Sequence, residues 1–243
     1  MPTIGPGITI GPGITTTRGV VQDSLVMDIN SNAALSYPGS GANWFDTSPS
    51  KLVMGGNASY ISSGVNGAVS GVTWATATTN ILNNDFHSIF FMIRFNSSVS
   101  YPSGTTGGWE QIFAYYGGGS DRSPGVWRYP SQRYIHWRYD PGNSGCDFGP
   151  DSIGGPGAEF AINTWYYVGV TKNGGTATSY VNGVSLGTQG VSNPKTAGTS
   201  PVYLYPYYTN PLANINNILI YNKVLTATEV AQNFTAVRGL YGI

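Results

Sequence analysis

The chain has 243 residues, of which only 9% are charged, and eleven basic residues balance eleven acidic ones. Proteins that bind nucleic acids need an excess of lysine and arginine to neutralise phosphates, so this balance argues against that class. No apolar run has the length of a membrane span, and the N-terminus lacks the basic start and apolar core of a secretory signal. We therefore expect a protein made in a cytoplasm without a signal peptide, which binds neither nucleic acid nor membrane.

The first segment of the chain is rich in glycine and proline. The unit Ile-Gly-Pro-Gly-Ile-Thr occurs twice in tandem over residues 4–15. Proline and glycine disfavour a helix, so residues 1–18 are predicted to be extended. The alternatives are a flexible tail and a docking arm that becomes ordered on a partner. In the docking-arm hypothesis the apolar contacts come from four isoleucines: Ile4, Ile8, Ile10 and Ile14.

The rest of the chain, residues 19–243, reads as one domain of many strands. Apolar and aromatic patterns predict strands within residues 20–30, 88–95, 110–116, 126–139, 165–188 and 215–222. In the fifth of these segments three strands form a meander, and Asn182-Gly183 is a strong signal for a type I′ hairpin turn. Pro130 is expected to join two aromatic strands within 126–139.

One helix is predicted near the C-terminus. Thr226 and Glu229 have the spacing of a capping box, in which each side chain satisfies a backbone donor at the start of a helix. Val230, Phe234 and Val237 recur at helical spacing and are expected to be buried. Gly239 follows at the position where a left-handed glycine commonly ends a helix.

Three stretches together resemble the laminin-G-like, concanavalin-A-like jelly-roll family, in the form found in tailed-phage structural proteins. They are WYYVGVTKNGGTATSYVNGVSLG, NINNILIYNKVLTATEV and LVMDINSNAALSYPGSGANWFDTSPS. The resemblance covers most of residues 20–238. It implies an all-β, two-sheet antiparallel jelly-roll sandwich, here with one short C-terminal helix and an extended N-terminal arm. Many members of the family bind glycans, some hold a calcium ion, and others are glucanases.

Catalytic groups are not indicated. Glycoside hydrolysis needs two opposed carboxylates, and no predicted strand carries two acids in alternation. The two histidines, His87 and His136, are too few for a typical catalytic zinc site with histidine ligands. Neither has a candidate nucleophile near it in the sequence. Where the family's closing segment commonly has acidic residues, this chain has Asn214, Asn216 and Asn217. We therefore expect a protein that is not an enzyme and requires no cofactor.

The loop of residues 140–151 has two interpretations. Calcium takes six to eight oxygen ligands in loose geometry, which such a loop can supply. The alternative is an Asx-rich turn, in which Asp and Asn bond their own backbone. The calcium ligands would be Asp140, Asn143, Asp147 and Asp151.

The aromatic stretch 126–139 is the candidate ligand site. Rings with a few polar groups among them are typical of binding sites, and sugars present CH faces to such rings. Alternation places Tyr134, His136 and Arg138 on one face of a strand, opposite a face that we expect in the core. The alternatives are a packed sandwich face and a subunit interface. The candidate glycan-binding residues are Trp127, Tyr129, Tyr134, His136 and Arg138.

Two functions follow from these patterns. Cys146 is the single cysteine, so the fold uses no internal disulfide, while the low charge is typical of proteins that act outside cells. This combination, with the arm, favours a non-catalytic phage structural protein on the virion surface, a head decoration or a short head or tail appendage. Its partners would be coat or tail subunits and further copies of itself. The alternative is an adhesin that binds a host-surface glycan.

Overall fold

The computed structural model describes most of the chain from residue 19 onward. The described residues are 19–30, 33–37, 44–51, 53–54, 59–61, 68–70, 72–73, 85–96, 108–115, 122, 124–140, 142–154, 157–192, 202–204 and 213–243. The predicted docking arm, with its four isoleucines, lies outside them. The predicted domain boundary at residue 18 stays a prediction.

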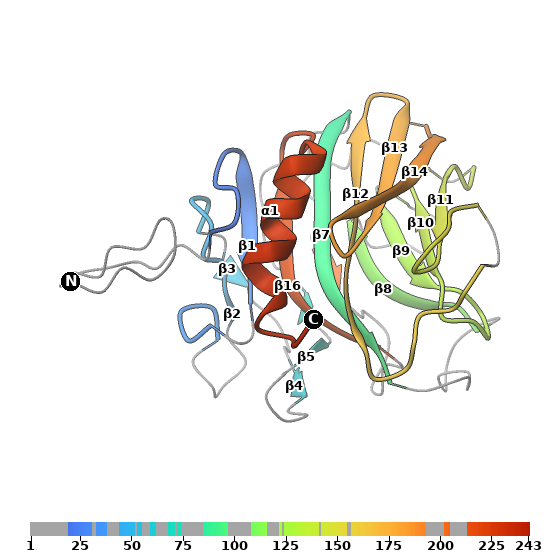
Figure 1. The fold of residues 1–243 in the computed structure, drawn as a ribbon. Helices are drawn as coiled ribbons and strands as arrows, with labels where there is room; N and C mark the ends of the chain where they lie inside the picture. The colour runs from blue at the N-terminus through green and yellow to red at the C-terminus, as the bar shows by residue number, and fades with distance from the viewer. Residues whose placement is uncertain are drawn as a thin grey trace.

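The larger of two antiparallel sheets has eight strands. They are β1 (Leu25–Ile29), β4 (Ser59–Ile61), β5 (Ala68–Ser70), β7 (Phe86–Phe95), β12 (Trp165–Asn173), β13 (Thr176–Val181), β14 (Val184–Gly190) and β16 (Ala213–Tyr221). Their spatial order is β14-β13-β12-β7-β16-β5-β4, and β1 also pairs with β16 (Figure 1). The meander predicted over residues 165–188 is confirmed as β12, β13 and β14. Asn182 and Gly183 both have the positive φ of a type I′ turn.

The second sheet has six strands and faces the first. They are β6 (Val72–Thr73), β8 (Glu110–Tyr115), β9 (Gly125–Arg128), β10 (Ile135–Arg138), β11 (Gly145–Phe148) and β15 (Val202–Leu204), in the order β11-β10-β9-β8-β15-β6. A separate ribbon pairs β2 (Trp44–Phe45) with β3 (Val53–Met54). The all-β sandwich with one terminal helix is therefore confirmed.

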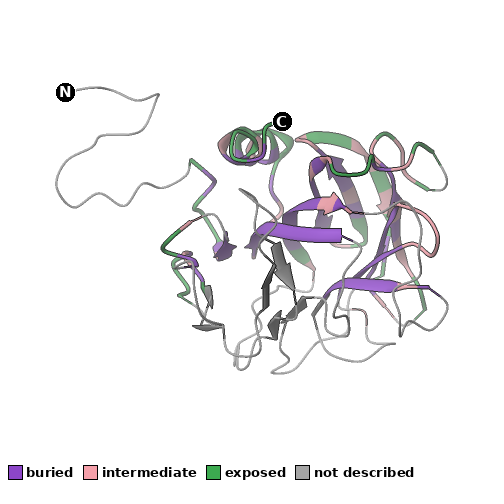
Figure 2. Ribbon diagram, turned by 90° about the horizontal axis from the view of Figure 1, so that it is seen from below, coloured by how far each residue is buried: buried purple, intermediate pink, exposed green. Residues whose placement is uncertain are grey.

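The main core fills the space between the two sheets. Phe91 of the large sheet stacks on Trp137 of the small one, with ring centroids 6.0 Å apart. β7 is apolar on both faces because its odd-numbered residues, such as Ile89, enter this core. Its even-numbered residues, such as Phe90, enter a second core on the other side of the sheet. Figure 2 shows these central strands buried. This double burial explains the continuous apolar run in the sequence.

The helix α1 (Ala227–Arg238) covers the second core. Its predicted capping box is present, with Thr226 as the N-cap residue and Glu229 three positions later. Val230 and Val237 are buried as predicted, but Phe234 is only half-buried, and Asn233 takes a buried position instead. Phe234 lies at the edge of the helix contact, where its ring stacks on Tyr167.

The predicted end of the helix differs from the structure. Gly239 is the C-cap residue in the right-handed helical conformation, with φ of −61°, and not a left-handed glycine. The left-handed backbone occurs three residues later at Gly242, with φ of +71°. In the described part of the chain, no helix has the length and apolar character needed to cross a membrane.

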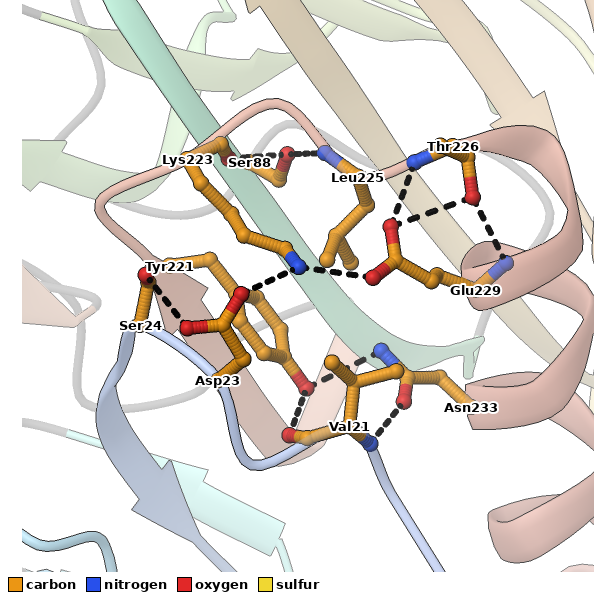
Figure 3. Close-up of polar contacts among 10 residues, drawn as sticks. All are labelled: Val21, Asp23, Ser24, Ser88, Tyr221, Lys223, Leu225, Thr226, Glu229 and Asn233. Atoms are coloured by element: carbon orange, nitrogen blue, oxygen red, sulfur yellow. Dashed lines mark hydrogen bonds and ion pairs between the residues drawn. The ribbon is translucent and has the colours of Figure 1, made fainter.

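Buried polar contacts join the start of the domain to this helix (Figure 3). The Val21 N–H donates to the Asn233 side chain at 2.8 Å, and the Asn233 amide donates to the Tyr221 hydroxyl at 3.0 Å. That hydroxyl donates in turn to the Val21 carbonyl at 3.1 Å. These bonds satisfy the buried polar groups around Asn233, so a polar residue is tolerated on the buried face of α1.

Candidate functional site

One row of side chains crosses the outer face of the six-stranded sheet. The register places Gln111 of β8 beside Trp127 of β9, Trp127 beside His136 of β10, and His136 beside Asp147 of β11. Cross-strand partners lie on the same face of a sheet, and the next residue along each strand lies on the other. Trp137 follows His136 and enters the core, so this row faces away from the other sheet.

His136 is surrounded by three aromatic rings. The centroid of its ring lies 4.5 Å from Trp109, 5.6 Å from Tyr129 and 6.0 Å from Trp127. Trp109 and Tyr129 also contact each other, with centroids 4.8 Å apart. His136 and Trp127 are buried, whereas Trp109 and Tyr129 are half-buried. A ligand at this face would therefore meet Trp109 and Tyr129 first.

Asp147 links His136 to Arg138. The Nδ1 atom of His136 lies 2.8 Å from one carboxylate oxygen of Asp147, and Arg138 Nη2 donates to the other at 2.7 Å. Arg138 also donates to the Trp137 carbonyl through Nη1 at 2.9 Å and to Asn143 Oδ1 through Nε at 3.2 Å. These bonds fix the orientation of all three charged or polar side chains.

Burial and hydrogen bonding set the protonation of this group. Burial lowers the pKa of His136 below its ordinary value, although the hydrogen bond to Asp147 acts in the opposite direction. Burial acts to raise the pKa of Asp147, but hydrogen bonds from His136 and Arg138 outweigh it, and the pKa is lowered. At neutral pH a neutral His136 thus donates Nδ1–H to a charged Asp147, which leaves Nε2 as an acceptor.

Two glycines make room for Arg138 and Trp127. Gly125 and Gly145 are the register partners of Arg138 on its two neighbouring strands. A Cβ atom on Gly125 would lie 2.1 Å from the Trp127 ring, and one on Gly145 would lie 1.9 Å from the Trp137 carbonyl oxygen and 2.9 Å from Arg138 Cδ. Only glycine at these positions lets both side chains lie along the sheet.

A second arginine stands at the rim of this face. The guanidinium of Arg122 lies over the Trp127 ring, 5.3 Å from its centroid. Arg122 Nη1 also donates to Asn143 Oδ1, the oxygen that Arg138 reaches from the other side. Asn143 is exposed and left-handed, with φ of +71°, which asparagine tolerates better than most residues.

Four of the five predicted glycan-binding residues come together here: Trp127, Tyr129, His136 and Arg138. Tyr134 does not join them, because it is buried at the end of the hairpin, where its ring lies close to Gly149. The sequence analysis missed Trp109 and Arg122. Trp109 immediately precedes a predicted strand, but neither residue lies within the 126–139 stretch.

The four predicted calcium ligands do not converge. Asp140 accepts a hydrogen bond from the Ser144 N–H at 2.9 Å, as in an Asx-rich turn. Asn143 Oδ1 faces two guanidinium groups, Asp147 is engaged by His136 and Arg138, and Asp151 is exposed. Among the residues that the structure describes, no three histidine, cysteine or acidic side chains are placed to hold a metal ion. The geometry favours the Asx-rich turn.

Solved structures with the same architecture come from toxins and a sialidase. The binding domain of Paraclostridial Mosquitocidal Protein 1 matches with a TM-score of 0.66 at 13% identity, over 91% of this chain and 55% of that one. The binding domain of botulinum neurotoxin serotype D matches with a TM-score of 0.62 at 15% identity, over 88% and 52%. A Trypanosoma rangeli sialidase mutant displaying trans-sialidase activity gives 0.57 at 17% identity, over 90% and 34%.

These likenesses show the fold alone, and the chain spans about half or less of each of those structures. No curated protein sequence matches it. The toxin and sialidase structures lend no support to the expected phage origin. A family model described as the concanavalin A-like lectin/glucanases superfamily matches residues 97–231, more than half of the sequence. The chain therefore belongs to the concanavalin A-like lectin/glucanase superfamily, with the laminin-G-like form of the jelly roll.

Proposed function

We propose that this domain is a non-catalytic glycan-binding domain that uses the outer face of its six-stranded sheet. The observation that carries the proposal is the ring cluster of Trp109, Trp127 and Tyr129 around the hydrogen-bonded group of His136, Arg138 and Asp147. A sugar has apolar CH faces and a rim of hydroxyls. Aromatic rings beside a few fixed polar groups match both parts of it.

Each polar side chain has a distinct task in this proposal. The neutral His136 accepts a hydroxyl hydrogen at Nε2, because Nδ1–H is committed to Asp147. Arg138 and His136 hold the Asp147 carboxylate, whose side chain keeps 23% of its surface exposed. The arrangement is fixed before the ligand arrives, which lowers the entropy cost of binding.

The absence of catalysis is part of the proposal. Glycoside hydrolysis needs two carboxylates that flank the scissile bond, one of them protonated. Asp147 instead faces an imidazole and a guanidinium, and its lowered pKa keeps it charged at neutral pH. Such a carboxylate is suited to accept hydrogen bonds and cannot act as a general acid at neutral pH.

The comparisons support this function better than the phage hypothesis. Two of the similar structures are named as binding domains of toxins, which is an analogy at the level of the fold. A place on a virion surface, coat or tail partners and self-association remain hypotheses from the sequence. A host-surface adhesin, the alternative drawn from the sequence, agrees best with the aromatic face.

A glycan array tests the proposal directly. The purified domain is expected to bind a defined subset of glycans, and isothermal titration should confirm the strongest of them. Trp109→Ala should weaken that affinity about thirtyfold, the effect of losing an aromatic anchor worth roughly 2 kcal/mol. Phe86→Ala is the matched control, since Phe86 is a 45%-exposed aromatic residue of the other sheet. An array without binding, or equal losses in the two variants, would contradict the proposal.

A further inference from the structure

Arg122 carries a charge that has no ion-pair partner among the residues that the structure describes. Its guanidinium lies over the Trp127 ring, and its one hydrogen bond in the described part of the chain goes to the neutral oxygen of Asn143. Its Nε atom is buried and has no hydrogen-bond partner among the described residues. Buried donors are almost always paired, so an unpaired one beside a candidate ligand site points to a missing acceptor.

The charged side chains that the structure describes around Arg122 do not neutralise it. Burial and then the charge of Arg138 lower its pKa, and the charge of Asp140 offsets only part of this effect. Asp140 uses a carboxylate oxygen to accept the Ser144 N–H, while Asp147 pairs with Arg138. An anion placed at Arg122 would supply the acceptor that Nε lacks.

We propose that the ligand is an acidic glycan, whose carboxylate or sulfate binds Arg122 while its sugar ring packs on the neighbouring aromatic rings. This inference rests on the proposed glycan-binding function and specifies its ligand class. A guanidinium offers parallel N–H donors that match the two oxygens of a carboxylate or a sulfate. The Trp127 ring beneath it and Asn143 beside it hold these donors in place.

The test uses pairs of polysaccharides that differ in the acidic group. Polygalacturonate is compared with its fully methyl-esterified form, and dextran sulfate with dextran, by affinity electrophoresis of the full chain. At least one acidic probe is expected to bind about tenfold or more tightly than its neutral partner. The pair that shows this preference tells a carboxylate ligand from a sulfate ligand.

Arg122→Gln should remove the preference, so that the acidic probe binds no more tightly than its neutral partner. Arg238→Gln, on the exposed face of α1, removes the same charge far from the site and should keep the preference. Arg122→Lys retains the charge without the planar fork and should give an intermediate affinity. This variant still tests the idea if the glutamine variant does not fold.

Four results would overturn the inference. Equal binding of acidic and neutral probes would do so, as would equal losses in the Arg122 and Arg238 variants. Binding of neutral glycans on the array without binding of either acidic probe would remove the acidic ligand but leave the proposed function standing. A domain that binds no glycan at all would contradict both the acidic ligand and the proposed glycan-binding function.

Discussion

The two outer faces of the sandwich both carry aromatic residues, yet those residues have different surroundings. On the eight-stranded sheet, Phe90 and Tyr167 stack with centroids 5.2 Å apart and belong to the core beneath α1. On the six-stranded sheet, the rings of Trp109 and Tyr129 enclose a histidine that is bound to a carboxylate. Aromatic content alone therefore does not mark a site. The proposal of a binding site rests on the combination of rings with fixed polar and charged groups.

The face of the eight-stranded sheet beneath α1, here called the covered face, has polar groups that are buried and hydrogen-bonded. The helix above it has a complete capping box, and its one buried polar side chain, Asn233, bonds to both Val21 and Tyr221. At the rim of the other face, Arg122 retains a buried donor without a partner in the described residues. The proposed ligand would supply an acceptor for this donor, because a buried donor is stabilised when it is paired.

The largest loss of stability is expected from a substitution on the covered face. Phe90 is fully buried and contacts Tyr167 and Tyr180. Phe90→Ala should lower the free energy of unfolding by about 3–5 kcal/mol, because it removes a ring from a packed core. Urea denaturation measures this loss, with Phe86→Ala on the same strand as an exposed control. A loss below about 1 kcal/mol would mean that α1 does not seal this core.

A smaller loss of stability is expected on the candidate binding face. Asp147→Asn keeps the shape of the side chain but leaves Arg138 without its anion, at a cost of roughly 1–3 kcal/mol. Glycan affinity should fall as well, since the acceptor changes from carboxylate to amide. Asp151→Asn, at an exposed position, is the control for the lost charge. Equal stability of the two variants would show that the Asp147 pairs do not hold this face together.

The pH dependence of stability should come in part from His136. Its pKa is below the ordinary value of 6.5, so the unfolded chain binds a proton at a pH where the folded protein does not. The contribution of His136 to the free energy of unfolding is therefore fully present above about pH 6.5, and it is lost as the pH drops toward the pKa of the folded protein. Burial and the charges of Arg138 and Arg122 lower this pKa, whereas Asp147 raises it, so the net effect is modest.

Thermal unfolding at pH 7 and pH 5 measures this contribution. From pH 7 to pH 5 the melting temperature of the wild-type protein should fall further than that of His136→Gln. The glutamine amide can still donate to Asp147. The same loss in both proteins would assign the acid sensitivity to other groups. The Asp147 carboxylate does not interfere, because its hydrogen bonds from His136 and Arg138 hold its pKa below the ordinary value of an aspartate, outside this interval.

Local patterns predicted the elements well, and long-range register explains what they missed. The strand at 88–95, the meander at 165–188 and the capping box each follow from neighbouring residues. The sequence pattern predicts Asp147 as a calcium ligand in the loop of residues 140–151, but it lies in β11 opposite His136. Strand pairing decides such neighbours, and a sequence does not display it. The same limit hid Trp109 and Arg122.

The smallest loss of stability is expected from a substitution next to the N-terminus of α1. Lys223 bridges Asp23 at 2.8 Å and Glu229 at 2.6 Å (Figure 3). Glu229 has a lowered pKa, chiefly because Lys223 donates a hydrogen bond to it, so the bridge is charged at neutral pH. The Asp23 side chain is 74% exposed, however, and water and salt screen such pairs strongly.

Lys223→Gln should therefore cost only about 0.5 kcal/mol or less, measured by urea denaturation at low salt. The difference between variant and wild type should vanish in 1 M sodium chloride, where the screening length falls to about 3 Å. Lys51→Gln, which removes an exposed lysine elsewhere, is the matched control. A loss above about 1.5 kcal/mol that persisted in high salt would place the attachment of the N-terminal segment in this bridge. The buried bonds of Asn233 to Val21 and Tyr221 would then be the secondary contacts.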